Sequence, residues 1–507
     1  MGKTISTAVG LERLSRTNGY AIQRGRFNND TPNLPQLIAV FGEANTANQA
    51  GLTVDKVEVT SAAEAATLFG EGSPIHSMIR ILRPLSGDGV GGIPTIVFPQ
   101  ISDVGATATE REWTVTGTAT ANATHTVVVN GRESLDFKSY SYSVAIGDTP
   151  TVVAAKITDA INGVTGSPCS ASSALGVVTI TSKWKGATSS QLDISFNLGG
   201  VASGLSYSET ASIDGGGAVD LADSLSQFGD DWYTIVLNPY GATQLSSLEE
   251  FNGVPNDLAP TGRYSGLIFK PFVAYFGSTL SVRASLVAIT DDAARVSQVT
   301  NALCPAPASK GFDHEAAANV VALASRTYQD SPHRDVSNFS YPDMPIPANG
   351  NIGDMGNYND RDVLLKNGCS TVILKDGAYV VQDLVTTYHP DGEVPLQYNY
   401  ARNVNLDFNV AYAYRLLEAL NLMDKTVVSD GQNVDVSGVI KPKEWKGIVF
   451  SLLDELATKG LINDPQFSKD SLEVIISTTN PNRFETAFPY KRTGTVRISS
   501  TTAKAGF

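Results

Sequence analysis

The sequence has few charged residues for its length of 507. Only 17% of its residues are charged, against about 25% in an ordinary soluble domain. Thr, Ser, Gly and Asn fill the deficit, and these residues favour strands and turns over long solvated helices. Since one domain takes about 150 residues, we expect several domains, rich in β-structure, with a polar but weakly charged surface.

The chain also lacks long apolar runs and an excess of basic residues. No stretch approaches the roughly 20 apolar residues of a membrane span, and no apolar core follows the basic start, so we expect no secretory signal. Acidic residues number 51 and basic residues 37, a net charge of −14, whereas nucleic-acid binding needs clustered Lys and Arg. We therefore expect no nucleic acid among the partners and no membrane insertion. The chain is expected to stay in a cytoplasm or to leave it without signal-dependent export.

Cysteine and histidine are scarce. The three cysteines, Cys169, Cys304 and Cys369, are widely spaced, which excludes a complete disulfide framework within the chain and gives no zinc spacing. Because free cysteine is usually buried, we interpret them first as buried thiols. The five histidines form no pair at helix spacing.

Motifs of catalysis are missing as well. We find no Gly-x-Ser-x-Gly elbow with a partner base and no phosphate-binding loop with its Lys. The glycines of 87–92 lack dinucleotide spacing and are interpreted as a turn. Two tight groupings of acid and histidine, at 313–315 and 333–335, are interpreted as surface or cap residues. We therefore expect no catalytic, cofactor-binding or metal site, no cofactor and no enzymatic activity.

The charge is unevenly distributed along the chain. The first 29 residues have a net charge of +4. The last 19 carry Lys491, Arg492, Arg497 and Lys504 without an acid, again +4. Subtracting 8 from −14 leaves −22 on residues 30–488. An acidic body between two basic tails is a first indication of self-association.

Both tails have the alternation of a short strand. Ile5, Thr7 and Val9 fall on one side of the first tail. In the second, Val496 and Ile498 lie opposite Thr495 and Arg497. Each strand is expected either at the edge of its own sheet or paired with the sheet edge of another copy.

The body between the tails is expected to be an α+β fold with several domains. Apolar runs at 37–42, 93–99 and 232–237 predict buried strands, and a capping box at Ser61 and Glu64 predicts a helix that ends at Phe69. From about 110 to 213, short strands and one helix predict an inserted β-sandwich. Farther along we expect a strand at 281–289, a hairpin around 375–377, and helices at 313–325, 360–367, 405–422 and 443–458.

Several segments resemble a known family. Ser61-Ala62-Ala63-Glu64-Ala65, followed by Phe69-Gly70-Glu71-Gly72-Ser73, resembles a segment of the contractile phage tail-sheath proteins of the Mu type. Other pieces are similar to the same family in the same chain order: 115–120, 154–162, 228–233 with 239–240, 364–370, 385–388 and 491–498. The resemblance extends from about residue 37 to the C-terminus.

This resemblance implies a structural subunit of a bacteriophage virion tail. Such subunits polymerise helically around a tail tube and contract to drive the tube through the host envelope. The implied partners are other copies of the chain, the tube protein, and the baseplate and tail terminator proteins, with assembly in the host cytoplasm. The family's arms are strands that complete sheets on neighbouring subunits, which assigns Ile5, Thr7, Val9, Thr495, Val496, Arg497 and Ile498 to contacts between subunits.

The resemblance also suggests a division of the chain and a hypothesis about its thiols. In an extracellular particle, cysteines of different copies could form inter-subunit disulfides. The expected parts are an arm and linker (1–36), a sheath core (37–109 and 214–395), an outward β-sandwich (110–213), a tube-proximal domain (396–488) and an arm strand (489–507).

Two alternatives stay open. A phage-tail-like bacteriocin or a secretion system uses a sheath of the same kind. From a different class, a carbohydrate-binding or depolymerising surface protein would need an aromatic platform with paired carboxylates, and the insert offers mainly Trp113 and Trp184 without such a pair.

Overall fold

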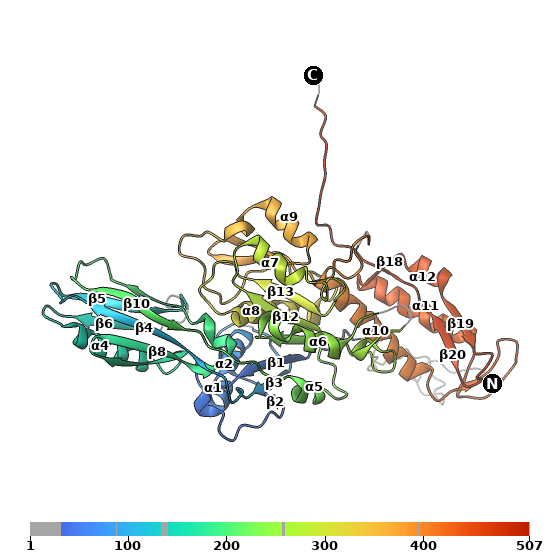
Figure 1. The fold of residues 1–507 in the computed structure, drawn as a ribbon. Coiled ribbons are helices and arrows are strands. Elements are labelled where there is room, and N and C mark those ends of the chain that lie inside the picture. Colours follow the sequence, from blue (N-terminus) through green and yellow to red (C-terminus); the bar gives the residue numbers. More distant parts are fainter. Residues whose placement is uncertain (1–31, 88, 133–139, 256–258, 394–395, 506–507) are drawn as a thin grey trace, which may run out of the picture.

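The computed structural model describes residues 32–87, 89–132, 140–255, 259–393 and 396–505. The molecule is elongated (Figure 1), with a central body, a lobe of antiparallel strands at one end and a helical part at the other. Within the described residues, no helix is both long and apolar enough to cross a bilayer.

The central body is built on a six-stranded sheet with the order β13-β12-β11-β1-β3-β2. Adjacent strands are parallel except β2, which runs antiparallel to β3. The strands are β1 (Ile38–Glu43), β2 (Val57–Glu58), β3 (Thr95–Gln100), β11 (Ile235–Asn238), β12 (Val273–Ser278) and β13 (Asn301–Pro305). The three apolar runs predicted β1, β3 and β11, because strands covered on both faces are apolar throughout.

Helices cover both faces of this sheet. On one face, Val40, Val97 and Leu237 share a core with α1 (Ala62–Phe69), α2 (Pro74–Leu82) and α8 (Asp313–Asp330). On the other face, Phe41, Phe98 and Val236 pack with residues of α5 (Ala222–Ser226) and α6 (Leu245–Asn252). The alternation of side chains along each strand divides the two cores.

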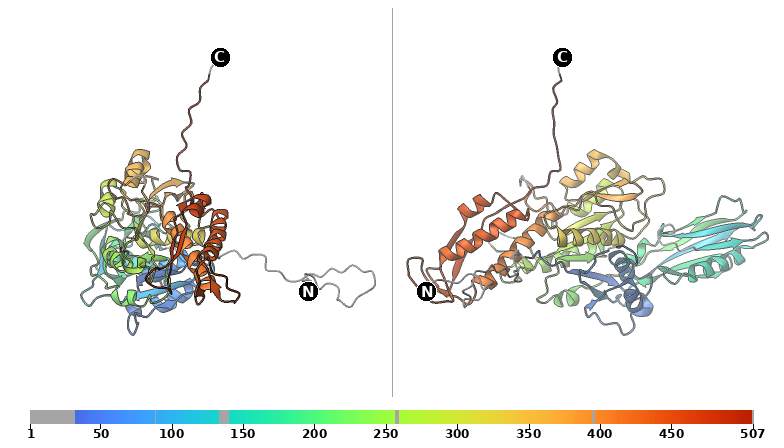
Figure 2. Two further views of the ribbon diagram at one scale, coloured as in Figure 1. Left: turned by 90° about the vertical axis from the view of Figure 1, so that its right-hand side faces the viewer. Right: turned by 180° about the vertical axis from the view of Figure 1, so that it is seen from behind.

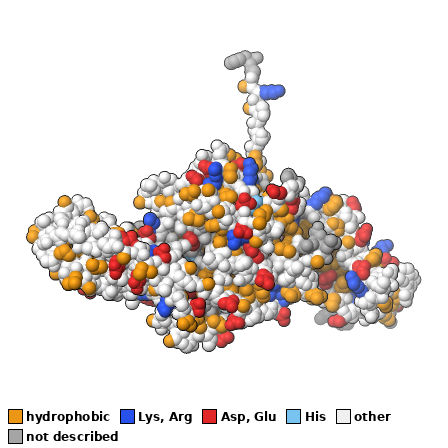
Figure 3. Space-filling view, in the orientation of Figure 1, with side chains coloured by type: hydrophobic (Ala, Val, Ile, Leu, Met, Phe, Trp, Pro, Cys, Tyr) orange, Lys and Arg blue, Asp and Glu red, His pale blue; other side chains and the backbone are white. Residues whose placement is uncertain are grey.

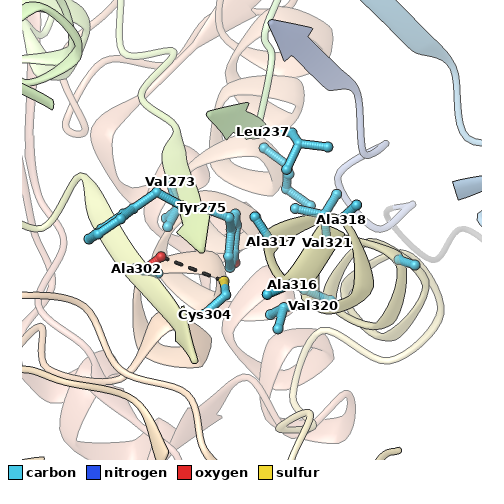
Figure 4. Packing of buried hydrophobic residues seen from close by; sticks show 14 of the residues in the cluster. Leu237, Val273, Tyr275, Ala302, Cys304, Ala316, Ala317, Ala318, Val320 and Val321 are labelled. Carbon is cyan, nitrogen blue, oxygen red and sulfur yellow. Dashed lines mark hydrogen bonds between the residues drawn. The ribbon is translucent and has the colours of Figure 1, made fainter. Parts of the chain in front are cut away.

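Small residues bring α8 close to the sheet. Figure 4 shows Ala316, Ala317 and Val320 of α8 beside Tyr275 and Cys304. A Cβ atom at Gly277 would collide with the backbone carbonyl of Asp313 at the start of the helix. Glycine is therefore required at this position of β12 by the close approach of α8.

The predicted cap of the first helix is present, and the second helix is capped in a similar way. The backbone N–H of Glu64 donates to Ser61 Oγ at 3.2 Å, and the carboxylate of Glu64 accepts from the backbone N–H of Thr60 at 2.8 Å. Ser73 accepts in the same way from the backbone N–H of His76 at 3.1 Å, with Pro74 as the first residue of α2. These bonds satisfy amide donors that a helix start leaves unpaired.

The lobe contains two antiparallel sheets and one helix. One sheet has the order β10-β4-β8-β7 and the other β6-β5-β9. Their elements are β4 (Ala108–Thr116), β5 (Ala123–Val129), β6 (Ser141–Val144), α4 (Pro150–Asn162), β7 (Cys169–Ala174), β8 (Val177–Lys185), β9 (Ile194–Asn197) and β10 (Ser206–Ile213). Both sheets and the helix share one apolar core, and the far end of the lobe shows few charged side chains on the face in Figure 3.

The rest of the chain forms a hairpin and the helical part. The hairpin of β14 (Thr371–Lys375) and β15 (Ala378–Asp383) turns at Asp376 and Gly377, both with positive φ, as the Asp-Gly pair predicts. The helices are α9 (Tyr358–Lys366), α10 (Ala401–Asn421), α11 (Pro442–Thr458) and α12 (Pro465–Ser471). The short strands are β16 (Thr426–Val427), β17 (Val439–Ile440), β18 (Ile462–Asn463), β19 (Glu473–Ile476), β20 (Phe484–Ala487) and β21 (Lys491–Arg492).

One predicted element is wrong, and two strands of the central sheet were not predicted. The segment predicted as a strand at 281–289 is the helix α7 (Arg283–Thr290). Its buried residues, Leu286 and Thr290, stand four apart, which is helix spacing. The sequence analysis did not predict β12 and β13, the strands that complete the sheet beyond β11.

Candidate assembly site at the C-terminal arm

The C-terminal arm (residues 489–507) was predicted as the site of contact between copies. Figures 1 and 2 show its last described residues leaving the body as an extended segment. The other predicted arm residues, Ile5, Thr7 and Val9, lie outside the described residues. The C-terminal arm therefore provides the geometry of the site.

The arm begins with an ion pair to α10. Arg492 donates from Nε to Asp407 Oδ1 at 2.7 Å and from Nη2 to Asp407 Oδ2 at 2.5 Å. The hydroxyl of Tyr490 donates to the same carboxylate at 2.7 Å. Burial alone would lower the pKa of Arg492, but the two hydrogen bonds to Asp407 hold it above its ordinary value. The pair fixes the start of the arm, where β21 pairs with β18.

The next residue is held by a second arginine of α10. Arg402, 3% exposed, donates to the backbone carbonyl and to Oγ1 of Thr493. The hydroxyl of Thr493 in turn donates to the carbonyl of Gly460 at 2.6 Å.

The same helix also holds the chain at its first described residues. The backbone N–H of Leu34 donates to Asn409 Oδ1 at 2.9 Å. The residues that lead into β1 and those that lead into the C-terminal arm are thus both anchored on α10.

Arg497 is the last anchored residue of the arm. Its guanidinium donates to the carboxylates of Asp335 and Asp383 and lies 3.7 Å above the ring centroid of Tyr400. The flanking side chains turn outward, with Val496 88% and Ile498 86% exposed. Arg497 therefore faces the body and the apolar residues beside it face solvent, while Thr495, predicted on the side of Arg497, is exposed as well.

The predicted arm residues are extended here but not paired in a sheet. No strand is assigned among the described residues beyond Arg492, so Thr495, Val496 and Ile498 stand exposed in an extended segment. Their pairing with another copy stays a prediction.

Three of the four basic residues of the arm pair with acids of their own chain. Besides Arg492 and Arg497, Lys491 Nζ lies 2.7 Å from Asp464 Oδ2. Lys504 lies on the exposed end. The basic charge that indicated another copy is thus largely neutralised within the chain.

Sequence reasoning missed the acidic partners of the arm. The grouping at 333–335 was singled out, but its acid was interpreted as a surface or cap residue, whereas Asp335 is 9% exposed. Asp407 lies between Leu406 and Phe408, both buried on α10. An acid between buried residues was the available signal, although it does not identify the partner.

The other grouping was also predicted at the surface, and that part of the prediction is wrong. Glu315 caps α8, accepting from the backbone N–H of Phe312 at 3.2 Å, but it and His314 are each 1% exposed. Burial lowers the pKa of His314 to about 3, so its ring is neutral.

The three cysteines are buried and free, as the first interpretation predicted. Cys304 and Cys369 lie in the core of the central body and Cys169 in the core of the lobe. A disulfide between copies would require these cores to open, so their burial argues against the cross-linking hypothesis.

Neither tryptophan considered for the alternative carbohydrate platform forms an exposed aromatic surface. Trp184 is fully buried and packs against Phe312 of the body, and Trp113 packs against Phe196 inside the lobe. Among the described residues, no group of three or more His, Cys, Asp or Glu could hold a metal ion.

Comparison with known proteins gives one clear sequence relative. No protein-family model matches the chain. The Mu-like prophage FluMu tail sheath protein of Haemophilus influenzae is 24% identical over 437 residues, which are 85% of this chain and 84% of the relative.

Two solved structures are more distant. The sheath tail protein of Desulfitobacterium hafniense covers 90% of this chain and 93% of its own, with 12% identity and a TM-score of 0.43. The contracted helical sheath of the anti-feeding prophage covers 97% and 99%, with 9% identity and a TM-score of 0.42. The comparison therefore depends on the sequence relative. Along most of its length the chain is related to the tail sheath proteins of Mu-like phages, which confirms the resemblance predicted from its sequence.

Proposed function

We propose that the chain is the repeating subunit of a contractile phage tail sheath. Copies polymerise helically around a tail tube and move into a shorter lattice that drives the tube through the host envelope. The observation that carries the proposal is the sheath relative, which is similar over 85% of the chain. The work is done by rearrangement of subunits, and no catalytic residue is assigned.

The partners and parts follow from this role. The tail tube, the baseplate and the tail terminator are the proposed neighbours, in a virion tail assembled in the host cytoplasm. We propose domain boundaries after residues 36, 109, 213, 395 and 488. The central body is then the sheath core, the lobe is an outward β-sandwich, and the helical part faces the tube. The lobe suits an outward position because its core is complete without the body.

The β19–β20 hairpin is the proposed acceptor of an arm from another copy. Among the described residues these two strands pair only with each other, and an isolated two-stranded sheet is marginally stable. Its outer edges offer unpaired backbone groups for strand addition. An arm with Val496 and Ile498 on one side can add apolar contacts to those hydrogen bonds.

Electron microscopy of the purified full-length chain tests the proposed function. Striated tubes are expected, and a chain that stays monomeric at every concentration and salt would contradict the proposal. The matched variant ends at Arg497, because a truncation at 489 would also remove Arg492 and damage the body. This variant is expected to stay folded and monomeric, and tubes of normal appearance would rule out the arm.

Cysteine pairs test the acceptor. Ile498→Cys combined with Ile475→Cys, whose native side chain is 53% exposed on β19, should give disulfide-linked ladders in tubes and none in monomers. Ile498→Cys with Ile146→Cys is the control, since Ile146 is 67% exposed but lies on the lobe.

A further inference from the structure

Arg497 is held by three separate segments of the chain. Asp335 follows α8, Asp383 is the last residue of β15, and Tyr400 precedes α10. The guanidinium pairs with both carboxylates and lies over the tyrosine ring, a site that suits a planar, delocalised cation.

The residues around the arginine are buried and fixed. The side chains of Asp335 and Asp383 are 4% and 12% exposed, and that of Arg497 is 18% exposed. β15 is bonded on one side to β14 and on the other to the segment at 338–341. Without the guanidinium, two buried carboxylates would lose their ion pair, which is costly. Asp335, Asp383 and Tyr400 form the site that we call the socket. The socket is therefore more stable with the guanidinium of Arg497 bound in it.

The chain changes character directly after this residue. Residues 498–505 are all exposed, and Ile498 is 86% exposed. Residues 494–496 are exposed as well, but Arg497 is the last anchored residue among those described, so the free part of the chain begins after it.

We propose that Arg497 is a clamp that holds the arm to its own subunit, and that the segment beyond it, which begins at Ile498, joins a second copy of this chain. This inference rests on the proposed function, because it defines which part of the arm is exchanged. The ten residues after Arg497 span at most about 35 Å when fully extended, so the acceptor on the second copy must lie within that distance of the clamp. The clamp also sets the point and direction from which the free segment leaves.

Trypsin digestion of the soluble monomer tests the clamp. Trypsin must take the Lys or Arg side chain into its own pocket, so Arg497 is protected while it occupies the socket and Lys504 is not. At its C-terminal end, the native chain is expected to lose only residues 505–507. Arg497→Lys keeps the cleavage site but loses the planar fork, and Asp335→Asn with Asp383→Asn removes the charge of the socket. Both variants should lose 498–507 at least ten times faster than the native chain, as read by intact mass.

Three controls make the outcome decisive. Asp330→Asn changes an exposed acid at the end of α8 and should leave the digestion unchanged. Cleavage after Lys491 or Arg492 would report opening of β21 instead of release of the clamp. If circular dichroism shows that the double variant does not fold, Arg497→Lys carries the test alone.

Two results would overturn the clamp. One is cleavage after Arg497 in the native chain as fast as after Lys504, and the other is no faster cleavage in Arg497→Lys. Since the assay uses monomer, its outcome is independent of whether the chain forms tubes.

Discussion

The hydroxyl of Thr188 donates to Oε1 of Glu43 at 3.1 Å and so joins the lobe to the last residue of β1. This contact lies where the order of the central sheet reverses, because β1 has β3 on one side and β11 on the other. Open parallel sheets bind their ligands at such a point, beyond the carboxyl ends of the strands. Here the position beyond the carboxyl end of β1 is occupied by two residues of the lobe, Thr188 and Trp184. Trp184 Nε1 donates to Thr188 Oγ1 at 3.0 Å.

The first prediction concerns the pH dependence of stability at this contact. Burial raises the pKa of Glu43 from 4.5 to about 7. Between those values the folded chain retains a proton that the unfolded chain releases, so Glu43 lowers the free energy of unfolding as pH rises through this range. The full effect is at most about 3 kcal/mol. The groups that face this carboxyl are the hydroxyls of Thr188 and Tyr240.

Glu43→Gln should remove this dependence. We expect nearly the native free energy of unfolding at pH 5 and a more stable variant at pH 8, measured by urea denaturation at both values. A difference between variant and native chain that is the same at both pH values would contradict the assigned role.

The second prediction concerns the ion pairs between lobe and body. Arg132 of the lobe lies 3.1 Å from Glu315 and 2.8 Å from Asp343. Removing one partner of a buried pair costs about 3–5 kcal/mol. Arg80 also approaches both acids, at 3.6 and 3.4 Å, so we expect Arg132→Met to lose stability near the lower limit.

Lys310→Met is the matched control. Its pair with Asp193 joins the same two parts at 2.8 Å, but the lysine side chain is 62% exposed. An exposed pair contributes little, and its removal should leave the urea midpoint close to the native value. Equal losses in both variants would show that burial does not govern the junction.

The third prediction concerns the root of the C-terminal arm. Arg492→Ala leaves the carboxylate of Asp407, 15% exposed as a side chain, without its ion pair. We expect a loss of about 3 kcal/mol in the free energy of unfolding, measured by denaturation. Lys491→Ala, which removes an exposed contact with Asp464 and a cation–π contact with Phe467, should change it far less.

The fourth prediction concerns the thiols. Burial raises the pKa of Cys169 to about 11 and that of Cys369 to about 12, and it raises that of Cys304 as well. Thiols react as thiolates, so a thiol reagent should leave all three unmodified in the native chain and modify all three in denaturant. Non-reducing electrophoresis of assembled particles should show only monomer. A dimer band that disappears on reduction would revive the cross-linking hypothesis.

The sequence predicted well those elements whose signals are local. The cap at Ser61, the turn at Asp376-Gly377 and the apolar run of β1 each depend on residues within one element. β12 was missed although its apolar run, 273–276, is as clear as that of β1 and is likewise followed by a glycine, Gly277. The need for that glycine comes from α8, which is distant in the sequence.

The candidate site was predicted in part for the same reason. Alternation along the arm correctly placed Val496 and Ile498 on one side and Arg497 on the other. It did not predict where Arg497 binds, because Asp335 and Asp383 lie 162 and 114 residues away in the chain. The basic net charge of the arm indicated that it pairs with acidic residues. Charge alone does not distinguish acidic residues of the same chain from those of a neighbour.

The anchoring of both chain ends on α10 has a mechanical consequence. Asn409 holds the residues before β1, and Arg402 and Asp407 hold the start of the C-terminal arm. Tension applied at either end therefore reaches this helix of 21 residues. It also reaches α8, through the bond from Asn33 to Gln329, and the two carboxylates that hold Arg497. Neighbours that pull on the two ends at once would load α10 from both, so this helix couples the two ends within one subunit.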